Sequence, residues 1–327
     1  MISRRSAIFA FVIVPCAGPV VFAQAPARQF RLGILGASTQ EATRNLEAAF
    51  IQHLRVVGYR EGDNLSIVRR YAGGSQARMD VLARELIAEK IDLIFAPVTP
   101  AARAAQGATK SIPIVFAVSA DPLGAGLVDS LAHPGRNATG LSSLNVDLTG
   151  LRLALLKEVA PKAGRLAILA DPDSSVDALQ IEQARLAVQR IGVDLHVARA
   201  AKEADYELAF RTMVSARVGA LFVIPNPHNL TFRAAIIELA ARTRIPALYG
   251  VSEFVREGGL FSYSADYLDQ YRRAALYVDR ILRGARAADL PVEQPTKFEF
   301  IINLKTAMAL GITFPQSLLL RADEVIQ

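Results

Sequence analysis

The residues best suited to bind a small molecule gather in six short turns, each placed directly after a predicted strand. These turns cover residues 37–40, 98–100, 119–122, 171–175, 226–229 and 249–253. They are rich in Ser, Thr, Asp and Asn and contain no lysine. Since open α/β sheets bind ligands at the carboxyl ends of their strands, we expect these turns to line a ligand site. The same residue types also cap helices, so a structural role is the alternative for each turn taken alone.

One of these turns has the features of an anion site. Thr99 suits the N-cap of a helix, and Pro100 suits its first helical position. The free N–H groups behind them, starting at Ala101, would then face the ligand and suit a carboxylate. Ser38 and Thr39 could supply further hydrogen-bond donors. The other polar residues expected in the site are Gln40, Ser119, Ser174 and Asn226.

A ligand ammonium group would require a carboxylate, and three of the turns carry one. The candidates are Asp121, Asp171 and Glu253. Rings could pack against the side chain of the ligand, and those in or near the turns are Tyr249, Phe254, Tyr263 and His228. For each ring, ordinary packing in the core or at its rim is an equally good explanation. A site with these groups favours an amino acid or a related carboxylate as ligand.

Motifs of catalysis and of metal or cofactor binding are missing from the sequence. It contains neither G-x-G-x-x-G nor a Walker-type G-x-x-x-x-G-K. Residues 250–254 begin like a nucleophile elbow but lack its closing glycine. None of the four histidines stands at metal-ligand spacing from another His or Cys. We therefore expect no catalytic residue, no metal and no cofactor.

The beginning of the sequence has the pattern of an export signal. Two arginines are followed by an apolar segment, residues 7–14, and then by small residues that suit signal cleavage. We predict a signal peptide over residues 1–23, with cleavage near Ala23 or Ala25. The apolar segment is too short and too broken by proline for a membrane-spanning helix. The mature protein is therefore expected in the periplasm.

The composition favours a globular protein with two lobes. The chain has 327 residues, of which 52% are hydrophobic and 21% are charged. Its net charge is +6, but the basic residues are scattered singly, often beside acidic ones, as at Arg84 and Glu85. Because no run of basic residues has interleaved aromatics, nucleic-acid binding is not expected. The one cysteine, Cys16, lies in the predicted signal, so no intramolecular disulfide is possible.

From residue 31 onward, the hydrophobic pattern alternates between strands and helices. The predicted strands cover residues 31–35, 65–71, 91–96, 112–117, 165–170, 193–198, 220–224 and 246–249. The predicted helices cover residues 43–57, 76–90, 101–109, 151–159, 176–191, 206–216, 232–243 and 267–282. Strand–helix–strand units with short joints predict parallel sheets that are covered by helices on both faces.

The two halves of the chain resemble each other. In the first half, residues 94–97 form an apolar strand ending in proline, and an alanine-rich helix leads to an Ile-Pro-Ile segment at 112–114. In the second half, residues 222–225 and 245–247 repeat this arrangement. Two similar lobes in tandem are the simplest explanation, and chance similarity among apolar strands is the alternative.

Three segments are predicted to cross between the lobes. They are residues 138–143, residues 258–263 and the proline-flanked segment 291–302. The resulting division gives an N-terminal lobe of residues 28–140 plus 264–292 and a C-terminal lobe of residues 141–263 plus 293–327. Three crossings would form a hinge on which the lobes close like a jaw.

A set of short motifs between Arg31 and the C-terminus carries a family resemblance. They are GYREGDNL at 58–65, TPAA at 99–102, IPIVF at 112–116, DP at 121–122, GLV at 126–128, PGRNATG at 134–140, GGL at 258–260, LPVEQP at 290–295, NLKTA at 303–307 and LGI at 310–312. Together they resemble the ABC transporter substrate-binding family that includes tryptophan- and tyrosine-binding receptors.

The resemblance implies a fold, a role and partners. The fold is the type I periplasmic-binding fold, in which two Rossmann-like lobes with parallel sheets are joined by a three-strand hinge. The role is to bind a small-molecule ligand in the cleft between the lobes, as a monomer, and to deliver it to an ABC permease with a cytoplasmic ATPase. Two alternatives stay open at this point, namely a ligand-sensing module for a receptor kinase and an α/β enzyme.

Overall fold

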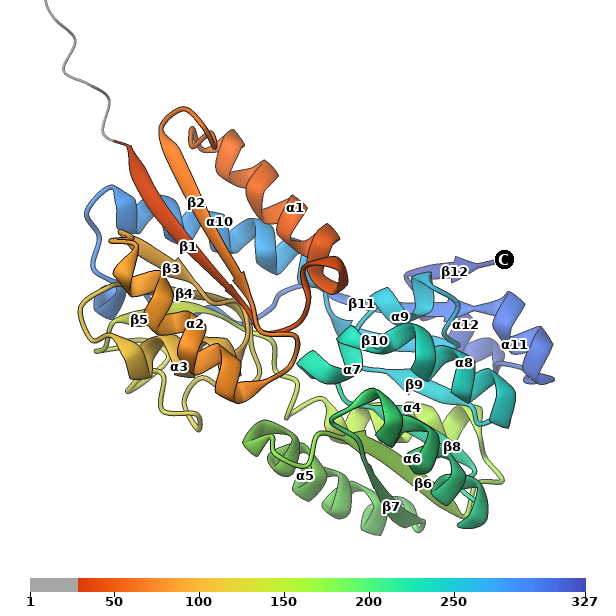
Figure 1. The fold of residues 1–327 in the computed structure, drawn as a ribbon. Coiled ribbons are helices and arrows are strands. Elements are labelled where there is room, and N and C mark those ends of the chain that lie inside the picture. Colours follow the sequence, from red (N-terminus) through yellow and green to blue (C-terminus); the bar gives the residue numbers. More distant parts are fainter. Residues whose placement is uncertain (1–28) are drawn as a thin grey trace, which may run out of the picture.

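Residues 29–327, which the computed structural model describes, form two sheets flanked by helices (Figure 1). The predicted signal peptide lies outside the described residues. Within residues 29–327, no helix has both the length and the apolar character needed to cross a membrane.

The first sheet contains five parallel strands in the order β2-β1-β3-β4-β5. These strands are β1 (Phe30–Gly36), β2 (Leu65–Tyr71), β3 (Leu93–Phe95), β4 (Ile114–Ser119) and β5 (Ala138–Ser142). Four helices cover it, namely α1 (Gln40–Val56), α2 (Gln76–Ala88), α3 (Thr99–Ala108) and α10 (Tyr267–Leu282). Helices α1 and α10 pack together on one face, and α2 and α3 pack together on the other. Helix α10 therefore returns late in the chain to complete the N-terminal lobe.

The second sheet contains seven strands in the order β12-β11-β10-β9-β8-β6-β7. These strands are β6 (Arg165–Ala170), β7 (Asp194–Arg199), β8 (Ala220–Val223), β9 (Ala247–Tyr249), β10 (Phe261–Ala265), β11 (Phe298–Asn303) and β12 (Glu324–Ile326). The remaining helices are α4 (Thr149–Val159), α5 (Ser175–Ile191), α6 (Glu203–Ser215), α7 (Pro227–Thr231), α8 (Arg233–Thr243), α9 (Glu253–Arg256), the 3-10 helix η1 (Ala287–Asp289), α11 (Leu304–Leu310) and α12 (Gln316–Leu319). All neighbouring strands are parallel except β10 and β11, which are antiparallel.

The two sheets repeat one strand order, as the internal similarity predicts. The order β2-β1-β3-β4-β5 in the first sheet corresponds to β7-β6-β8-β9-β10 in the second. In each sheet the strand order reverses at one point, between β1 and β3 in the first and between β6 and β8 in the second. Such a reversal leaves a crevice at the carboxyl ends of the two strands, which is where doubly wound sheets bind ligands.

The chain crosses between the lobes three times, but each predicted crossing segment includes a strand that pairs within a sheet, the third one through β11. Residues 138–142 pair with β4 as β5, and residues 261–265 pair with β9 and β11 as β10. The chain crosses just after each of these strands, and a third time between η1 and β11 (Figure 1). The first and third crossings lie side by side, because Glu293 exchanges backbone hydrogen bonds with Gly140 and Ser142.

Most predicted elements are present, and the differences concern one helix and the ends of β5 and β10. The helix predicted at 232–243 is α8, and the short helix α7 precedes it where only a turn was expected; Phe232 leaves helical geometry (φ −100°, ψ 23°) between the two. The predicted lobe boundaries after residues 140 and 263 fall inside β5 and β10, which end at Ser142 and Ala265.

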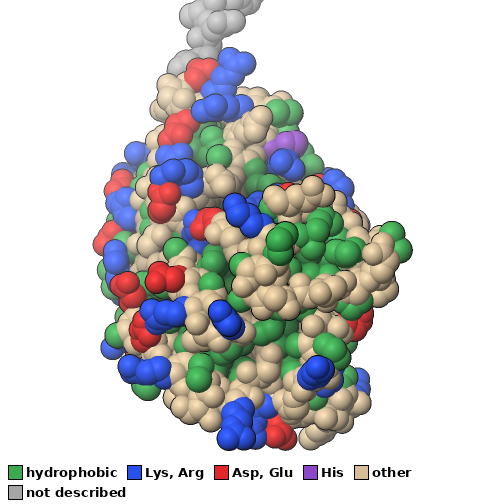
Figure 2. Space-filling model, turned by 90° about the vertical axis from the view of Figure 1, so that its right-hand side faces the viewer, with side chains coloured by type: hydrophobic (Ala, Val, Ile, Leu, Met, Phe, Trp, Pro, Cys, Tyr) green, Lys and Arg blue, Asp and Glu red, His purple; other side chains and the backbone are tan. Residues whose placement is uncertain are grey.

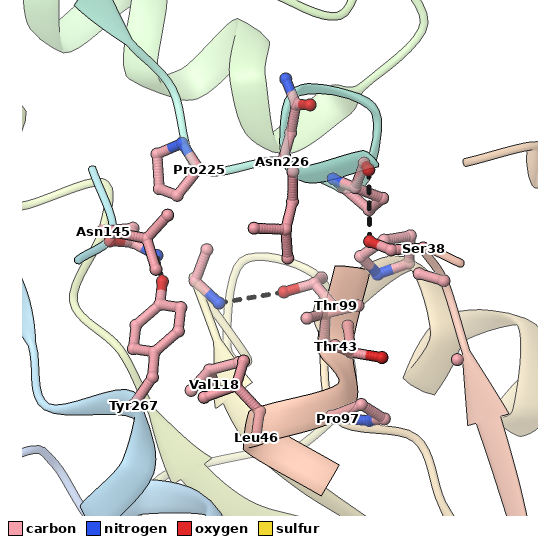
Figure 3. A pocket seen from close by; sticks show the side chains of 18 of the residues that line it. Ser38, Thr43, Leu46, Pro97, Thr99, Val118, Asn145, Pro225, Asn226 and Tyr267 are labelled. Atoms are coloured by element: carbon pink, nitrogen blue, oxygen red, sulfur yellow. Dashed lines mark hydrogen bonds between the residues drawn. The ribbon is translucent and has the colours of Figure 1, made fainter. Parts of the chain in front are cut away.

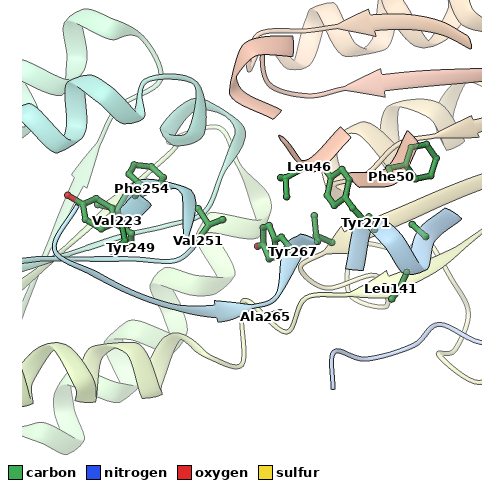
Figure 4. Packing of buried hydrophobic residues seen from close by; sticks show 14 of the residues in the cluster. Leu46, Phe50, Leu141, Val223, Tyr249, Val251, Phe254, Ala265, Tyr267 and Tyr271 are labelled. Atoms are coloured by element: carbon green, nitrogen blue, oxygen red, sulfur yellow. The ribbon is translucent and has the colours of Figure 1, made fainter. Parts of the chain in front are cut away.

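One group of buried apolar residues continues from lobe to lobe (Figure 4). In the N-terminal lobe, the rings of Phe50 and Phe95 stack with centroids 3.9 Å apart. In the C-terminal lobe, Tyr249 stacks on Phe254 at 4.7 Å. Figure 4 places Tyr267 between these two groups, at the start of α10. The lobes therefore share apolar contacts at the base of the cleft.

Candidate ligand-binding cavity

A cavity lies between the lobes at the two points where strand order reverses (Figure 3). The turns after β1 and β3 contribute its N-terminal wall, and the turns after β6 and β8 contribute its C-terminal wall. The lining residues from these four turns are Gly36, Ala37, Ser38, Pro97, Val98, Thr99, Pro100, Ser174, Val176, Asp177, Pro225, Asn226 and Pro227. The other two turns proposed from the sequence contribute one residue each, Ala120 after β4 and Val251 after β9, so all six turns reach the cavity.

The N-terminal wall presents two buried hydroxyl groups. The Ser38 hydroxyl donates a hydrogen bond of 3.2 Å to the carbonyl oxygen of Pro227 in the opposite lobe. The Thr99 oxygen accepts one from the amide of Ala120 at 3.0 Å and lies 3.0 Å from the Ser119 hydroxyl. These contacts fix the first turn of α3 against the end of β4.

The expected N-cap of α3 is shifted by one residue. Val98 is the N-cap, with extended geometry (φ −117°, ψ 159°), and Thr99 is the first residue of the helix. The Thr99 hydroxyl does not cap the helix, because it already bonds to β4 and the residue after it. Pro100 still lies in the first turn, where its missing N–H costs nothing.

The C-terminal wall contains a buried carboxylate that the sequence analysis did not select. Asp177, 1% exposed in the first turn of α5, accepts hydrogen bonds from the Asp171 amide, the Asn226 amide group and the Ser174 hydroxyl at 2.7–2.9 Å. Burial raises the pKa of Asp177 to about 6, although these three hydrogen bonds act in the opposite direction. No cationic side chain lines the cavity in the described chain, so a cationic ligand group would complete this arrangement.

The remainder of the cavity is mainly apolar. Leu46, Phe95 and Tyr271 line it from the N-terminal lobe and α10, and Val251 lines it from the C-terminal lobe. At one end, the Tyr71 hydroxyl bonds to the carboxylate of Glu47, which also pairs with Arg69. A ligand with a polar head and an apolar or aromatic side chain matches this lining.

The outer rim carries the pair Asp171 and His228. The Nδ1 atom of His228 lies 2.8 Å from the Asp171 carboxylate. Burial alone would raise the pKa of Asp171, but the contact with His228 and the amide of Asp173 hold it below its usual value. Both side chains line the wider groove outside the cavity rather than the cavity itself. Asp171 and His228 therefore belong to the groove that leads to the cavity.

Several expected site residues lie outside the cavity. Gln40 is exposed, Thr39 caps α1, and Ala101 is buried within α3. Ser119 lies behind the cavity lining, where its hydroxyl contacts that of Thr99, and Asp121 accepts a hydrogen bond from the amide of Gly124. Tyr249 stacks on Phe254, and Tyr263 stacks on Phe298. Glu253 lines a separate pocket beside α1. Asp121, Tyr249 and Glu253 come from turns after β4 and β9, one strand away from the points of reversal.

Two further cavity residues lie next to the crossings, outside the six turns proposed from the sequence. Asn145 follows β5, and Tyr267 follows β10 as the first residue of α10. The spacing Ser174-x-x-Asp177 is a signal that could have indicated the missed carboxylate. Such spacing is typical of a helix N-terminus, so it predicts a capping role before a binding role.

Contacts across the entrance hold the lobes together. Besides the bond from Ser38 to Pro227, Arg103 of α3 donates a hydrogen bond of 3.1 Å to the hydroxyl of Ser175. The ring of His228 lies against Gly74, where an added Cβ atom would approach it to 2.3 Å. The lobes are therefore in a closed arrangement around the cavity.

The charged side chains show no concentration of one sign on the face in Figure 2, where blue and red groups are interspersed. Apolar side chains gather near the centre of this face (Figure 2). Within residues 29–327, no group of three or more His, Cys, Asp or Glu side chains is arranged to hold a metal ion.

Comparisons with known proteins agree on one protein family. A sequence model of the family described as "ABC transporter substrate binding protein" matches residues 37–326. A curated relative, the tyrosine-binding protein of Clostridioides difficile, is 28% identical over 286 residues, which cover 87% of this chain and 82% of the relative.

Two solved structures are informative about the closed arrangement. A domain from Streptococcus pneumonia in complex with L-Trp is 25% identical, covers 91% of this chain and 100% of its own, and superposes with a TM-score of 0.83. A ligand-free, open substrate-binding protein with adhesive properties from Clostridium difficile, also 25% identical, covers 91% of this chain and 99% of its own, with a TM-score of 0.64. At equal identity, the chain is closer in shape to the ligand-bound structure.

Proposed function

The chain belongs to the ABC transporter substrate-binding protein family, and from this premise we propose that its ligand is an amino acid with an aromatic side chain. It is a solute-binding component of an ABC transporter with the type I periplasmic-binding fold. The observation that carries the proposal is Asp177, a buried carboxylate that faces a mainly apolar cavity and has no cationic partner among residues 29–327. Export to the periplasm, a monomeric state and delivery to a permease with its ATPase are parts of the same proposal.

The ligand ammonium group is assigned to Asp177. Its carboxylate is held in place by Ser174 and Asn226, so it needs no rearrangement to receive a cation. A charge-assisted hydrogen bond in a site closed off from water is stronger than a neutral one. Ser174 and Asn226 then act mainly by orienting the carboxylate.

The ligand carboxylate is assigned to the N-terminal wall. Helix α3 has ten residues and begins at the cavity, so the positive end of its dipole and its free amides face the ligand. The Ser38 hydroxyl lies on the same side of the cavity as Thr99 in Figure 3 and can donate to the ligand carboxylate in place of its bond to the Pro227 carbonyl oxygen. The absence of Arg and Lys from the described lining makes these neutral donors the available partners.

The side chain of the ligand is assigned to the apolar part of the cavity. Phe95, Tyr271 and Leu46 offer ring faces and an aliphatic contact there. The two relatives named above are a tyrosine-binding protein and a structure with bound L-Trp, which supports an aromatic side chain.

The test is direct identification of the ligand. Native mass spectrometry of the purified protein should detect a carried-over amino acid, and thermal-shift titration should find that L-tyrosine or L-tryptophan raises the melting temperature. A ligand present at 100 times its Kd stabilises a protein by about 2.7 kcal/mol. If aromatic and branched amino acids all leave the melting temperature unchanged, the amino-acid assignment is wrong.

Closure of the lobes gives a second test. Gly74→Ala is expected to weaken L-tyrosine binding about tenfold, because its new Cβ would lie 2.3 Å from His228 when the lobes close. Isothermal titration calorimetry measures the change. Gly73→Ala is the matched control, since Gly73 also has positive φ (63°) but its nearest neighbour would be 4.0 Å away.

A suppressor variant separates closure from backbone strain. His228→Ala added to Gly74→Ala removes the obstacle and should restore most of the lost affinity. If the double variant stays as weak as Gly74→Ala, the loss comes from the backbone at Gly74 (φ 93°) and not from the contact across the cleft.

A further inference from the structure

One side of the cavity is formed by a tyrosine that belongs to neither cavity wall. Tyr267 begins α10 directly after the second crossing, and Asn145 lies on the first crossing. In Figure 3, Tyr267 and Asn145 lie on one side of the cavity, while Ser38 and Thr99 lie on the other. A ligand whose carboxylate lies beside Ser38 and Thr99 therefore directs its far end toward Tyr267.

Donors approach the Tyr267 hydroxyl from the protein side. The Asn145 side-chain amide donates to it at 2.6 Å. Although burial and the charge of Glu253 raise the pKa of Tyr267, its hydrogen bonds with Asn145 and Ser143 and the charge of Arg152 act to lower it. In the described chain, no hydrogen bond donated by this hydroxyl is present. Because a hydroxyl that accepts a hydrogen bond still has its own proton to donate, that proton is available to the cavity.

A buried cation stands behind this hydroxyl. Arg152 is 0% exposed, and its partners in the described part of the chain are all neutral oxygens, namely the carbonyls of Tyr263, Asn145 and Gly250 and the side-chain oxygen of Asn145. Its guanidinium also lies over the ring of Phe222 at 5.5 Å. Burial lowers the pKa of Arg152 to about 10. A buried charge that no carboxylate neutralises favours an electron-rich group nearby.

The three residues form one directed chain of hydrogen bonds. Arg152 donates to the Asn145 side-chain oxygen at 2.8 Å, and the amide nitrogen of the same group donates to Tyr267. Each donation polarises the next group, so the Tyr267 hydroxyl becomes a stronger donor. A donor of this kind can form a hydrogen bond to an oxygen atom on the ligand, whereas a plain hydrocarbon ring has no oxygen to accept it.

We infer that Tyr267, oriented by Asn145 and Arg152, is a specificity determinant that donates a hydrogen bond to an oxygen atom on the ligand's side chain. The inference rests on the proposed function and deepens it, because it selects a hydroxylated aromatic side chain over a plain one. Tyr267 touches the ligand, and Arg152 acts through Asn145 as a positioning residue.

The experiment compares L-tyrosine with L-phenylalanine, which differ by the one hydroxyl group. By isothermal titration calorimetry, the full chain should bind L-tyrosine about tenfold or more tightly than L-phenylalanine, since an unmet buried hydrogen-bonding group is costly. Tyr267→Phe should lose that preference by weakening L-tyrosine binding and leaving L-phenylalanine within about threefold. Tyr277→Phe is the matched control, because Tyr277 is on the same helix as Tyr267 but does not line the cavity, and its hydroxyl donates to the carbonyl oxygen of Pro291.

The role of Arg152 is tested by the same ratio of affinities. Arg152→Met should lower the preference for L-tyrosine, and Arg152→Lys, which keeps the charge, should retain part of it. A purely structural role would weaken both ligands equally and leave the ratio unchanged. If either variant fails to fold, Tyr267→Phe alone decides the inference.

The outcomes separate this inference from the proposed function. Equal affinities of the unaltered protein for the two amino acids would overturn the inference and leave amino-acid binding in place. A preference for L-tyrosine that survives in Tyr267→Phe would also overturn it. Binding of neither amino acid would overturn both.

Discussion

Asp177→Asn is expected to weaken amino-acid binding by about 100- to 1000-fold, the largest effect on affinity that we predict. The substitution keeps the size of the side chain but removes the charge that would pair with the ligand ammonium group. Truncating one partner of a buried charge pair costs about 2–5 kcal/mol, because the other charge stays buried and unpaired. Calorimetric titration with L-tyrosine measures the loss.

The same carboxylate predicts how affinity depends on pH. Since the pKa of Asp177 in the empty cavity is raised to about 6, the side chain is ionised and ready for a cation above that pH. Below pH 6 the proton competes with the ligand, so affinity should fall about tenfold for each pH unit. In Asp177→Asn, this part of the pH dependence should be absent.

Asp173→Asn provides the matched control for Asp177→Asn. It removes the same charge from the same turn, but the side chain of Asp173 is exposed and lines the outer groove. Its affinity should stay within about threefold of the unaltered protein, because exposed charges are screened by solvent. A loss of less than threefold in Asp177→Asn itself would mean that the ammonium group binds elsewhere.

Much of the fold was predictable because strand and helix periods are local properties of a sequence. Strands at 65–71 and 165–170 and the helix at 267–282 begin and end where the pattern places them. The repeated proline-ended strands correctly indicated a tandem architecture, because both belong to equivalent strands, β3 and β8, of the two sheets. The crossings were predicted less accurately than the strands and helices. Residues 138–142 and 261–265 have the same apolar pattern whether they pair within a sheet or connect the two lobes.

The site was predictable only as a set of turns. A sequence indicates which residues follow a strand, but the strand order decides which turns meet. The turns at Ser38, Thr99 and Asn226 meet because their strands flank the points of reversal. Asp121 and Glu253 follow strands one position further along, and so they miss the cavity. Asp177 was missed because a carboxylate in a first helical turn has a sufficient structural explanation.

Asp177 and Glu253 have similar environments but different neighbours. Asp177 is buried and Glu253 is half-buried with its Oε2 atom covered, and burial raises the pKa of each. Asp177 receives three hydrogen bonds and faces the cavity, so it is prepared to stay ionised and to bind a cation. In the described chain, the Oε2 atom of Glu253 has no hydrogen-bond partner, so ionisation there has little compensation. Neutralising Asp177 is therefore expected to act on ligand affinity, and neutralising Glu253 on the free energy of unfolding.

Glu253→Gln is expected to stabilise the protein by about 2–3 kcal/mol at pH 8, the largest effect on stability that we predict. Burial raises the pKa of Glu253 to about 7 from its ordinary value of 4.5. The folded state then binds the proton more tightly than the unfolded state. The free energy of unfolding must consequently fall as pH rises from about 4.5 to 7, and level off above pH 7.

The nearby cations do not neutralise Glu253, because each is engaged by another carboxylate. Arg233 pairs with Glu257 at 2.7 Å, and Arg256 pairs with Glu324 at 2.7 Å. The charge of Glu299 acts in the same direction as burial and raises the pKa of Glu253 further. From the opposite lobe, Glu41 and Arg44 of α1 line the same pocket and pair with each other. A neutral glutamine therefore loses little attraction and avoids the cost of a buried charge.

Urea denaturation at pH 5 and pH 8 tests the Glu253 prediction. The stabilisation by Glu253→Gln should be present at pH 8 and nearly absent at pH 5, where the glutamic acid is already neutral in the folded protein. Glu257→Gln, which neutralises an exposed partner of Arg233, should change stability by less than about 1 kcal/mol at either pH. Equal stability of Glu253→Gln and the unaltered protein at pH 8 would mean that the carboxylate gains a compensating partner in solution. Because α1 belongs to the opposite lobe, opening of the cleft is the movement that would supply water as that partner.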